Sequence, residues 1–458
     1  AALTVAGWSR AARTRSRRAA LVIALMAVAA GGFWVQSHRH VKGLGDPDQL
    51  YVWGLFHYYL GAKYFDELGY THLYEQALVA DAEGARQLER VKTIRDLETY
   101  SFRPAAPVRN GERLDSWSDE RWAAFKADLE YITRLRAPGY WQGPLRDRGY
   151  NPSPAWHAVG VTIASLLSIR DPVSQTVLIL LDVLAVLMAF AVSVRAFGWA
   201  RSALVLGAFY LWFGNPERMF GQMFVLDWFA AAWAGVALWR LDRHRTAGVL
   251  LAYAAMVRVF PLLLLAGPLV QGAATLIRER RIPHAHRRLL AGAAATMLVL
   301  FVAGGLSSRQ GFSMWASFTG NIGHHSAEHA YGSKRLGLQH LFGLDWSGGF
   351  ARPAAKLDNR RNMRRNAPLT RITQVLLAGL VLLAMLRSDR RDALLLGAAL
   401  VFVGSVASRY YGAIFVLLLF LGARPRGDPL PPNAGTGVIA RARPGAWRAL
   451  DAALLGIV

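Results

Sequence analysis

The residues best suited to chemistry lie just after the first apolar stretch of the chain. Asp46 and Asp48 flank a proline, and a run of aromatic residues with one lysine follows them. Two carboxylates at a membrane mouth could bind a divalent cation or act as a general base beside a phosphate-bearing lipid. A solvated turn at a helix end explains the same Asp-Pro-Asp sequence equally well. The residues of this run that could contact a substrate are His57, Tyr58, Tyr59 and Lys63.

Cations inside or at the ends of apolar blocks form a second group of candidates. Arg258 follows an apolar helix, and Arg409 precedes Tyr410 and Tyr411 where the last long apolar block begins. An arginine at such a position is costly unless it is paired or functional. Snorkelling or a structural ion pair is the alternative for Arg258. Together with Lys63, the two arginines could stabilise a phosphate leaving group.

A histidine-rich segment at 324–329 lies in a long polar stretch further along the chain. Three histidines and one glutamate could ligate a metal, but their spacing matches no established zinc motif, so we assign no metal ligand. We favour a polar lining in which His324 or His325 binds a phosphate or a sugar hydroxyl. Two further cations, Lys334 and Arg335, follow this segment.

Apolar blocks must position these side chains, because the chain is 53% hydrophobic and has a positive mean hydropathy of +0.23. Several blocks approach the roughly 20 residues that cross the bilayer as a helix. Buried core helices could explain any one block, but not so many blocks separated by arginine-rich turns. We therefore expect an all-α polytopic membrane protein with about 10–11 transmembrane helices. The blocks lie near residues 19–35, 155–169, 173–194, 202–214, 222–240, 247–276, 290–304, 371–387, 391–407 and 411–422.

Arginines mark the expected cytoplasmic side. The formal charge of +23 sits at the ends of the apolar blocks, as the positive-inside rule describes, and not in one stripe that would suit nucleic acid. The N-terminus is therefore expected in the cytoplasm, with an uncleaved first helix favoured over a cleaved signal peptide. The sequence has no cysteine, which excludes disulfides and thiolate chemistry.

The expected organisation places two large polar loops on the outer face. Helical spacings around 78–97 and 120–135 predict surface-lying amphipathic helices in the first loop. The parts are a cytoplasmic N-terminus with the first helix (1–36), the first outer loop (37–154), a transmembrane bundle (155–304), the second outer loop (305–370), a further bundle (371–422) and a basic cytoplasmic segment with the start of a last helix (423–458).

The middle of the chain leaves two topologies open. Two clean crossings between 155 and 194 would place the arginines near 195–201 and 240–245 outside, although both groups look cytoplasmic. Either one block there is re-entrant, or 247–276 is a single long helix broken at Pro261.

The pattern from Tyr58 to Glu75 resembles the opening of polyprenyl-phosphate-sugar-dependent glycosyltransferases of the GT-C superfamily, especially the GT87 mannosyltransferase-like group. The matching residues are Tyr58-Tyr59, Ala62, Gly69 and Leu73-Tyr74-Glu75. Three later features agree: Gly221-Gln222 opens an apolar helix, Arg258-Val259-Phe260-Pro261 stands where the group usually has Lys-x-x-Pro, and Ser408-Arg409-Tyr410-Tyr411 lies near the end.

The resemblance implies an inverting enzyme of the inner (plasma) membrane of a bacterial cell envelope. It would take a hexose or pentose from a polyprenyl-phosphate donor on the outer face and pass it to a glycan or lipid acceptor. The group has its acid shortly before the Tyr-Tyr pair, where Gly54 stands here, so the base is assigned to Asp48 or Asp46. The Asn-containing run that the group has in the second loop corresponds to 332–335 here. The implied partners are the bilayer, donor, acceptor and membrane complex subunits, without nucleic acid.

Two other classes of function fit the same sequence. A non-catalytic membrane subunit or scaffold could keep this fold, and a lipid or sugar transporter is the third reading. A transporter should carry intramembrane charges at matching positions of two half-repeats, and Arg258 has no such counterpart. Neither G-x-G-x-x-G nor a P-loop lysine motif is present, so soluble nucleotide chemistry is not indicated.

Overall fold

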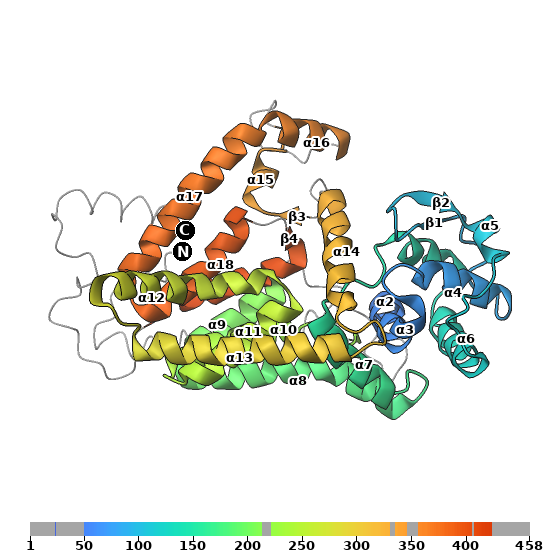
Figure 1. Cartoon of the computed structure of the whole chain (residues 1–458), viewed down its shortest axis with the longest axis horizontal. Coiled ribbons are helices and arrows are strands. Elements are labelled where there is room, and N and C mark those ends of the chain that lie inside the picture. Colours follow the sequence, from blue (N-terminus) through green and yellow to red (C-terminus); the bar gives the residue numbers. More distant parts are fainter. Residues whose placement is uncertain are drawn as a thin grey trace.

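The computed structural model describes residue 23 and residues 50–212, 221–329, 335–345, 356–404 and 407–423. These residues are mostly helical, and the two sheets among them have two strands each. Figure 1 shows a polar region, residues 50–153, at one end of the molecule and a bundle of longer helices beside it.

The polar region packs short helices around an aromatic core. Ser118 caps the longest of them, α6, because its hydroxyl accepts a hydrogen bond from the backbone N–H of Arg121 at 3.2 Å. The helix expected near 120–135 is therefore present as α6. The elements are α2 (Val52–Lys63), α3 (Phe65–Leu68), α4 (Leu73–Ala82), β1 (Thr93–Arg95), β2 (Phe102–Pro104), α5 (Ala105–Arg109), α6 (Asp119–Arg134), η2 (Pro138–Gln142) and η3 (Pro144–Arg146).

The helix predicted around 78–97 is wrong beyond its first turn. The α4 helix ends at Ala82, and β1 occupies part of the segment that was expected to be helical. The carboxylate of Asp81 accepts hydrogen bonds from the backbone N–H groups of Gln87 at 2.9 Å and Leu88 at 2.8 Å. These bonds stabilise a turn in which Arg86 is left-handed, with φ of 53°, and such a turn cannot continue the helix.

The bundle contains the segments long and apolar enough to cross a membrane, and the chain is therefore a mostly helical membrane protein. Four such segments are found in the described residues: Pro172–Phe197, Phe260–Glu279, His284–Leu306 and Ala367–Arg387. The bundle helices are α7 (Pro154–Leu166), α8 (Pro172–Phe197), α9 (Trp199–Leu211), α10 (Asp227–Arg240), α11 (His244–Val257), η4 (Phe260–Leu265), α12 (Ala266–Glu279), α13 (His284–Leu306), α17 (Ala367–Arg387), α18 (Arg390–Gly404) and η5 (Arg409–Phe420).

The middle of the chain departs from an unbroken series of long helices at two places. Helix α7 has only 13 residues and stays beside α2: Trp156, near its start, packs 5.3 Å from the Tyr58 ring, and Leu167, after its end, accepts a hydrogen bond from Tyr59. The block at 247–276 is two helices, α11 and α12, separated by η4. Pro261 explains the break, because proline disfavours a helical residue before it and lacks a backbone donor.

The bundle has two distinct ends. At the basic end, Arg390 pairs with Asp242 at 2.6 Å, and Gln271 donates hydrogen bonds to backbone carbonyls at the end of α17. At the other end, called the mouth here, Ser153 donates a hydrogen bond to the Met256 carbonyl at 2.7 Å. The polar region therefore adjoins the mouth.

Glycines let the bundle helices approach one another closely. A Cβ at Gly248 would lie 2.0 Å from the Leu289 carbonyl oxygen, and one at Gly267 would lie 2.0 Å from that of Ala393. Such backbone contact is typical of small residues between membrane helices.

The second polar stretch returns to the mouth through a short sheet. Strand β3 (Arg335–Leu336) pairs antiparallel with β4 (Ala407–Ser408), which leads directly into η5. The stretch also contains α14 (Ser313–His329), α15 (Leu338–Leu341) and α16 (Lys356–Arg365), which Figure 1 places on the same side of the bundle as β3 and β4.

Candidate functional site

Four of the sequence-predicted residues meet at the mouth: Tyr58, Arg258, Tyr410 and Tyr411. They come from α2, the end of α11 and the start of η5. The three tyrosines all exert an electrostatic influence on the Arg258 guanidinium. Residues far apart in the chain are thus brought together around one buried cation.

Arg258 is buried, with 7% of its surface exposed, and its hydrogen bonding is incomplete. One guanidinium nitrogen, Nη1, lies 3.5 Å from the Val257 carbonyl oxygen, and the guanidinium is 6.0 Å from the centre of the Tyr58 ring. The other two nitrogens, Nε and Nη2, have no hydrogen-bond partner in the part of the chain that the structure describes. A buried cation with free donors is costly, and an anion placed there would remove the cost.

Aromatic side chains surround this cation. The Tyr411 ring lies 4.7 Å from that of Phe260, 5.7 Å from that of Trp228 and 4.1 Å from that of Tyr410. The indole Nε1–H of Trp228 is also buried without a partner among the described residues. The enclosure therefore offers hydrogen-bond donors from both Trp228 and Arg258.

Two buried carboxylates at the mouth are absent from the sequence-based assignment. Asp227, at the start of α10, accepts a hydrogen bond from the Tyr253 hydroxyl at 2.7 Å through Oδ2, while its Oδ1 has no described partner. Asp182, inside α8, accepts hydrogen bonds from the backbone N–H groups of Val225 at 3.1 Å and Leu226 at 2.7 Å. An acidic residue within an apolar block was the signal that could have found both.

Gly54 is where the resembling group has its acid, and here it packs against Gln222. The backbone N–H of Tyr51 donates to the Gly221 carbonyl at 2.9 Å, which holds the start of α2 against this segment. A Cβ at Gly54 would lie 2.8 Å from Gln222 Oε1 and 2.9 Å from Tyr51 Cδ1. A longer side chain at this position would therefore have to displace the side chains of Gln222 and Tyr51.

His57 faces the core of the polar region. Its Nε2 lies 2.6 Å from the Tyr74 hydroxyl, and its Nδ1 lies 2.7 Å from the Trp53 carbonyl oxygen. The Tyr74 hydroxyl in turn accepts a hydrogen bond from the Gly149 N–H at 2.8 Å. These contacts give His57 a role in joining α2 to α4.

Lys63 and Tyr59 belong to a separate group of residues, called the Asp128 cluster here. Lys63 Nζ lies 2.6 Å from Asp128 Oδ2, which also accepts a hydrogen bond from the Tyr64 hydroxyl at 2.8 Å. Arg170 Nε lies 3.1 Å from the other carboxylate oxygen, Oδ1, and Tyr59 accepts a hydrogen bond from Lys63 at 3.2 Å. The cluster ties α2, α6 and the α7–α8 turn together.

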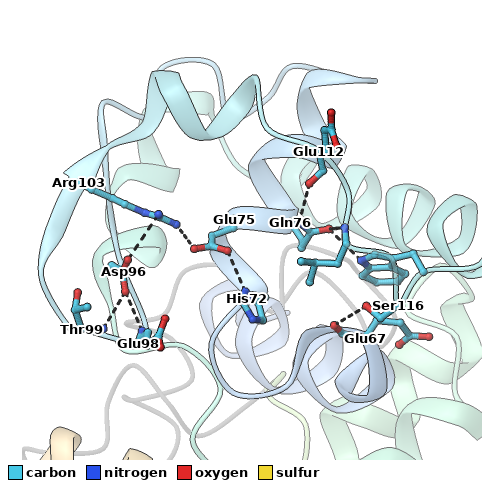
Figure 2. Close-up of polar contacts among 12 residues, drawn as sticks. Glu67, His72, Glu75, Gln76, Asp96, Glu98, Thr99, Arg103, Glu112 and Ser116 are labelled. Atoms are coloured by element: carbon cyan, nitrogen blue, oxygen red, sulfur yellow. Dashed lines mark hydrogen bonds and ion pairs between the residues drawn. The ribbon is translucent and has the colours of Figure 1, made fainter.

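A second polar site, in a cleft of about 400 Å³ in the polar region, contains Glu75 of the family-like run. Figure 2 shows Arg103 reaching Glu75 from β2, with His72 on the other side of the carboxylate and Asp96 close to the guanidinium. The hydrogen bond that His72 donates to the Glu75 carboxylate raises the pKa of His72. Burial tends to raise the pKa of Glu75, but the hydrogen bonds and positive charges of His72 and Arg103 outweigh burial and lower this pKa. The charges of Glu75, His72, Arg103 and Asp96 therefore form ion pairs with one another.

The remaining predicted residues lie wholly or partly outside the description. Asp46, Asp48 and Lys334 are outside the described residues. The backbone alone is described for four others: His324 and His325 in α14, Arg335 in β3 and Arg409 at the start of η5. No group of three or more histidines and acids in the described ranges is placed to hold a metal.

No protein-family model, curated protein or solved structure matches this chain.

The chemistry that the mouth can perform depends on Arg258, the aromatic residues around it and Asp227. The cation has unused donors, and the carboxylate has an unused acceptor. Such a pairing suits a ligand that carries both an anion and a hydroxyl.

Proposed function

We propose that the chain is an integral membrane glycosyltransferase of the GT-C type. It moves a sugar from a polyprenyl-phosphate donor to a glycan or lipid acceptor on the outer face of the inner membrane. The observation that carries the proposal is the buried Arg258 with two unpartnered nitrogens inside an aromatic enclosure. In this proposal about 10–11 helices, including the shorter apolar ones, cross the bilayer, and the N-terminus lies in the cytoplasm.

The donor phosphate would accept hydrogen bonds from Arg258 and Trp228. A guanidinium matches the geometry of phosphate oxygens, and the bond is stronger in a site that excludes water. The prenyl chain would leave along the apolar surface beside Arg258, where Val259 is 60% and Leu262 43% exposed. Val259 directly precedes a segment apolar enough to span the membrane, and Leu262 lies within that segment.

The reaction asks for one base and one stabilised leaving group. The acceptor hydroxyl attacks the anomeric carbon, the bond from that carbon to the phosphate oxygen breaks, and its electron pair leaves with the phosphate. Arg258 stabilises that developing charge, and a carboxylate takes the hydroxyl proton. The resemblance assigns this base to Asp48 or Asp46, and Oδ1 of Asp227 is the described carboxylate oxygen available for the same task.

The test measures binding by the full chain in neutral-lipid nanodiscs. We expect polyprenyl phosphate to bind and the corresponding polyprenol to bind weakly, because the alcohol lacks the anion. Arg258→Gln should weaken phosphate binding at least about tenfold, since hydrogen bonds to charged groups contribute about 1.5–3 kcal/mol. Arg240→Gln is the matched control, because Arg240 is equally buried but lies at the basic end.

Equal binding of the alcohol and the phosphate, or unchanged binding by Arg258→Gln, would overturn the donor site. Transfer itself is measured with labelled polyprenyl-phosphate sugars and membrane acceptors. Asp48→Asn, Asp46→Asn and Asp227→Asn should keep donor binding, and the variant that loses transfer identifies the base.

A non-catalytic subunit that binds the same lipid phosphate is the second candidate. Gly54 favours this candidate, because the acid that the resembling group has at this position would have to displace Gln222 and Tyr51 here. Donor binding without sugar transfer across a panel of labelled donors would select this candidate over the enzyme.

A further inference from the structure

Helix α16 carries a concentrated basic surface beside a candidate membrane span. Five of its ten residues are basic and one is acidic. It ends at Arg365, and α17 begins at Ala367, so the two helices are almost continuous in the chain. Figure 1 shows α16 at the end of α17 that lies away from α12.

The opposite face of α16 is fastened to the protein. Asn359 donates a hydrogen bond to the Gly343 carbonyl at 3.1 Å, and Asn366, just after the helix, donates one to the Phe342 carbonyl at 2.9 Å. Asn359 and Met363 are buried, and their spacing places them on one helix face. The residues left exposed on the rest of the helix are Asp358, Arg360, Arg361, Arg364 and Arg365.

Membrane insertion does not account for this basic surface. The other end of α17 already carries arginines, at Arg387, Arg390 and Arg391. The positive-inside rule needs cations on only one side of a span. A second group at the opposite end, on a helix fixed by asparagine hydrogen bonds, therefore calls for another explanation.

We propose that the exposed face of α16 binds the phosphate headgroups of anionic lipids in the leaflet where α17 begins. The short connection to α17 holds the helix near headgroup level, and the exposed Arg361, Arg364 and Arg365 complement an anionic surface. Guanidinium groups bind phosphate oxygens in a bidentate manner, and juxtamembrane basic clusters attract anionic lipids. This inference does not depend on sugar transfer, because no residue of the mouth takes part.

The test places a reporter on α16 itself in the full chain. The sequence contains no cysteine, so Asp358→Cys, at an exposed position, can carry the only fluorophore. The protein in neutral detergent is titrated with phosphatidylglycerol, phosphatidylcholine or inorganic phosphate. We expect only phosphatidylglycerol to change the fluorescence, with an affinity that falls as salt screens the charges.

Charge-removing and charge-preserving variants test whether the fluorescence change depends on the positive charges of α16. Adding Arg361→Gln, Arg364→Gln and Arg365→Gln should weaken the phosphatidylglycerol response about a hundredfold, since each arginine near an anionic surface contributes about fivefold. The same three positions changed to Lys should keep most of the affinity. An equal response to phosphatidylcholine, competition by inorganic phosphate, or an unchanged affinity in the Gln variant would overturn the proposal. If the triple Gln variant does not fold, Arg361→Gln alone should still weaken the response about fivefold.

Discussion

Helix α2 contributes to two buried charges that have opposite surroundings. Asp128 is fully buried: Lys63 and Tyr64 contact its Oδ2, and Arg170 Nε lies within ion-pair distance of its Oδ1, which accepts no hydrogen bond among the described residues. Arg258 is also buried, yet two of its nitrogens have no partner in the described part of the molecule. A buried charge flanked by two opposite charges stabilises the fold, whereas one with two unused donors can bind a ligand. We therefore expect the Asp128 cluster to stabilise the fold and Arg258 to bind a ligand.

The largest expected effect comes from removing the carboxylate of the Asp128 cluster. Asp128→Ala leaves Lys63 and the Tyr64 hydroxyl without their acceptor, and breaking a buried pair in this way costs about 3–5 kcal/mol. The free energy of unfolding, or thermal unfolding in detergent, measures the loss. Arg170→Gln is the control, because the Arg170 side chain is half exposed and its loss should cost less. Wild-type stability in Asp128→Ala would contradict a structural role for the cluster.

Removing the charge of Arg258 should instead increase the stability of the protein. Arg258→Met combined with Asp227→Asn removes a buried cation whose donors are unsatisfied together with the buried carboxylate that interacts with it, so the protein should gain about 1–3 kcal/mol of stability. Thermal unfolding without added lipid measures this change, and polyprenyl phosphate should no longer raise the unfolding temperature. A loss as large as that of Asp128→Ala would make Arg258 structural and remove the contrast between the two charges.

The difference between Arg258 and the Asp128 cluster also shows what could be predicted from the sequence alone. The long apolar helices depend on local apolar patterns, so their positions were accessible, and the break at Pro261 was one of two alternatives that the sequence left open. Arg258 was accessible because an arginine beside an apolar block is conspicuous. Lys63 was grouped with it because its partner, Asp128, lies 65 residues away, and only tertiary packing brings the two together. Asp227 was overlooked although an acidic residue inside the apolar block at 222–240 was a signal for it.

A substitution at Gly54 tests how closely the mouth is packed. Gly54→Ala places a Cβ against Gln222 and Tyr51, and overpacking of this kind costs about 1–3 kcal/mol. It should also weaken polyprenyl-phosphate binding, because Gln222 precedes the segment that leads to Trp228. Unfolding and lipid titration of the same preparation measure both effects.

A glycine in open surroundings supplies the matched control. Gly320, in α14, has nothing within 4 Å of its expected Cβ, so Gly320→Ala should stabilise the helix by up to about 1 kcal/mol. Equal effects at Gly54 and Gly320 would show that backbone propensity, and not the contact with Gln222, decides the outcome.

The smallest effect should come from the paired charges around Glu75, which are partly exposed. The pKa of His72 is raised, so its contribution is complete below the ordinary histidine value of 6.5 and is lost as pH rises through the folded value. The pKa of Glu75 is lowered, so its contribution is present above 4.5 and is lost as pH falls.

The contribution of this pair to stability is therefore greatest between pH 4.5 and 6.5. We expect it to be below about 1 kcal/mol, because solvent screens partly exposed pairs. Unfolding temperatures across pH should show wild type above His72→Gln in that window, with the difference vanishing at alkaline pH. His284→Gln, at the basic end, should follow the wild-type profile. A difference as large as that of Asp128→Ala would mean that exposure does not separate these two paired clusters, and burial would no longer explain why Asp128 matters most.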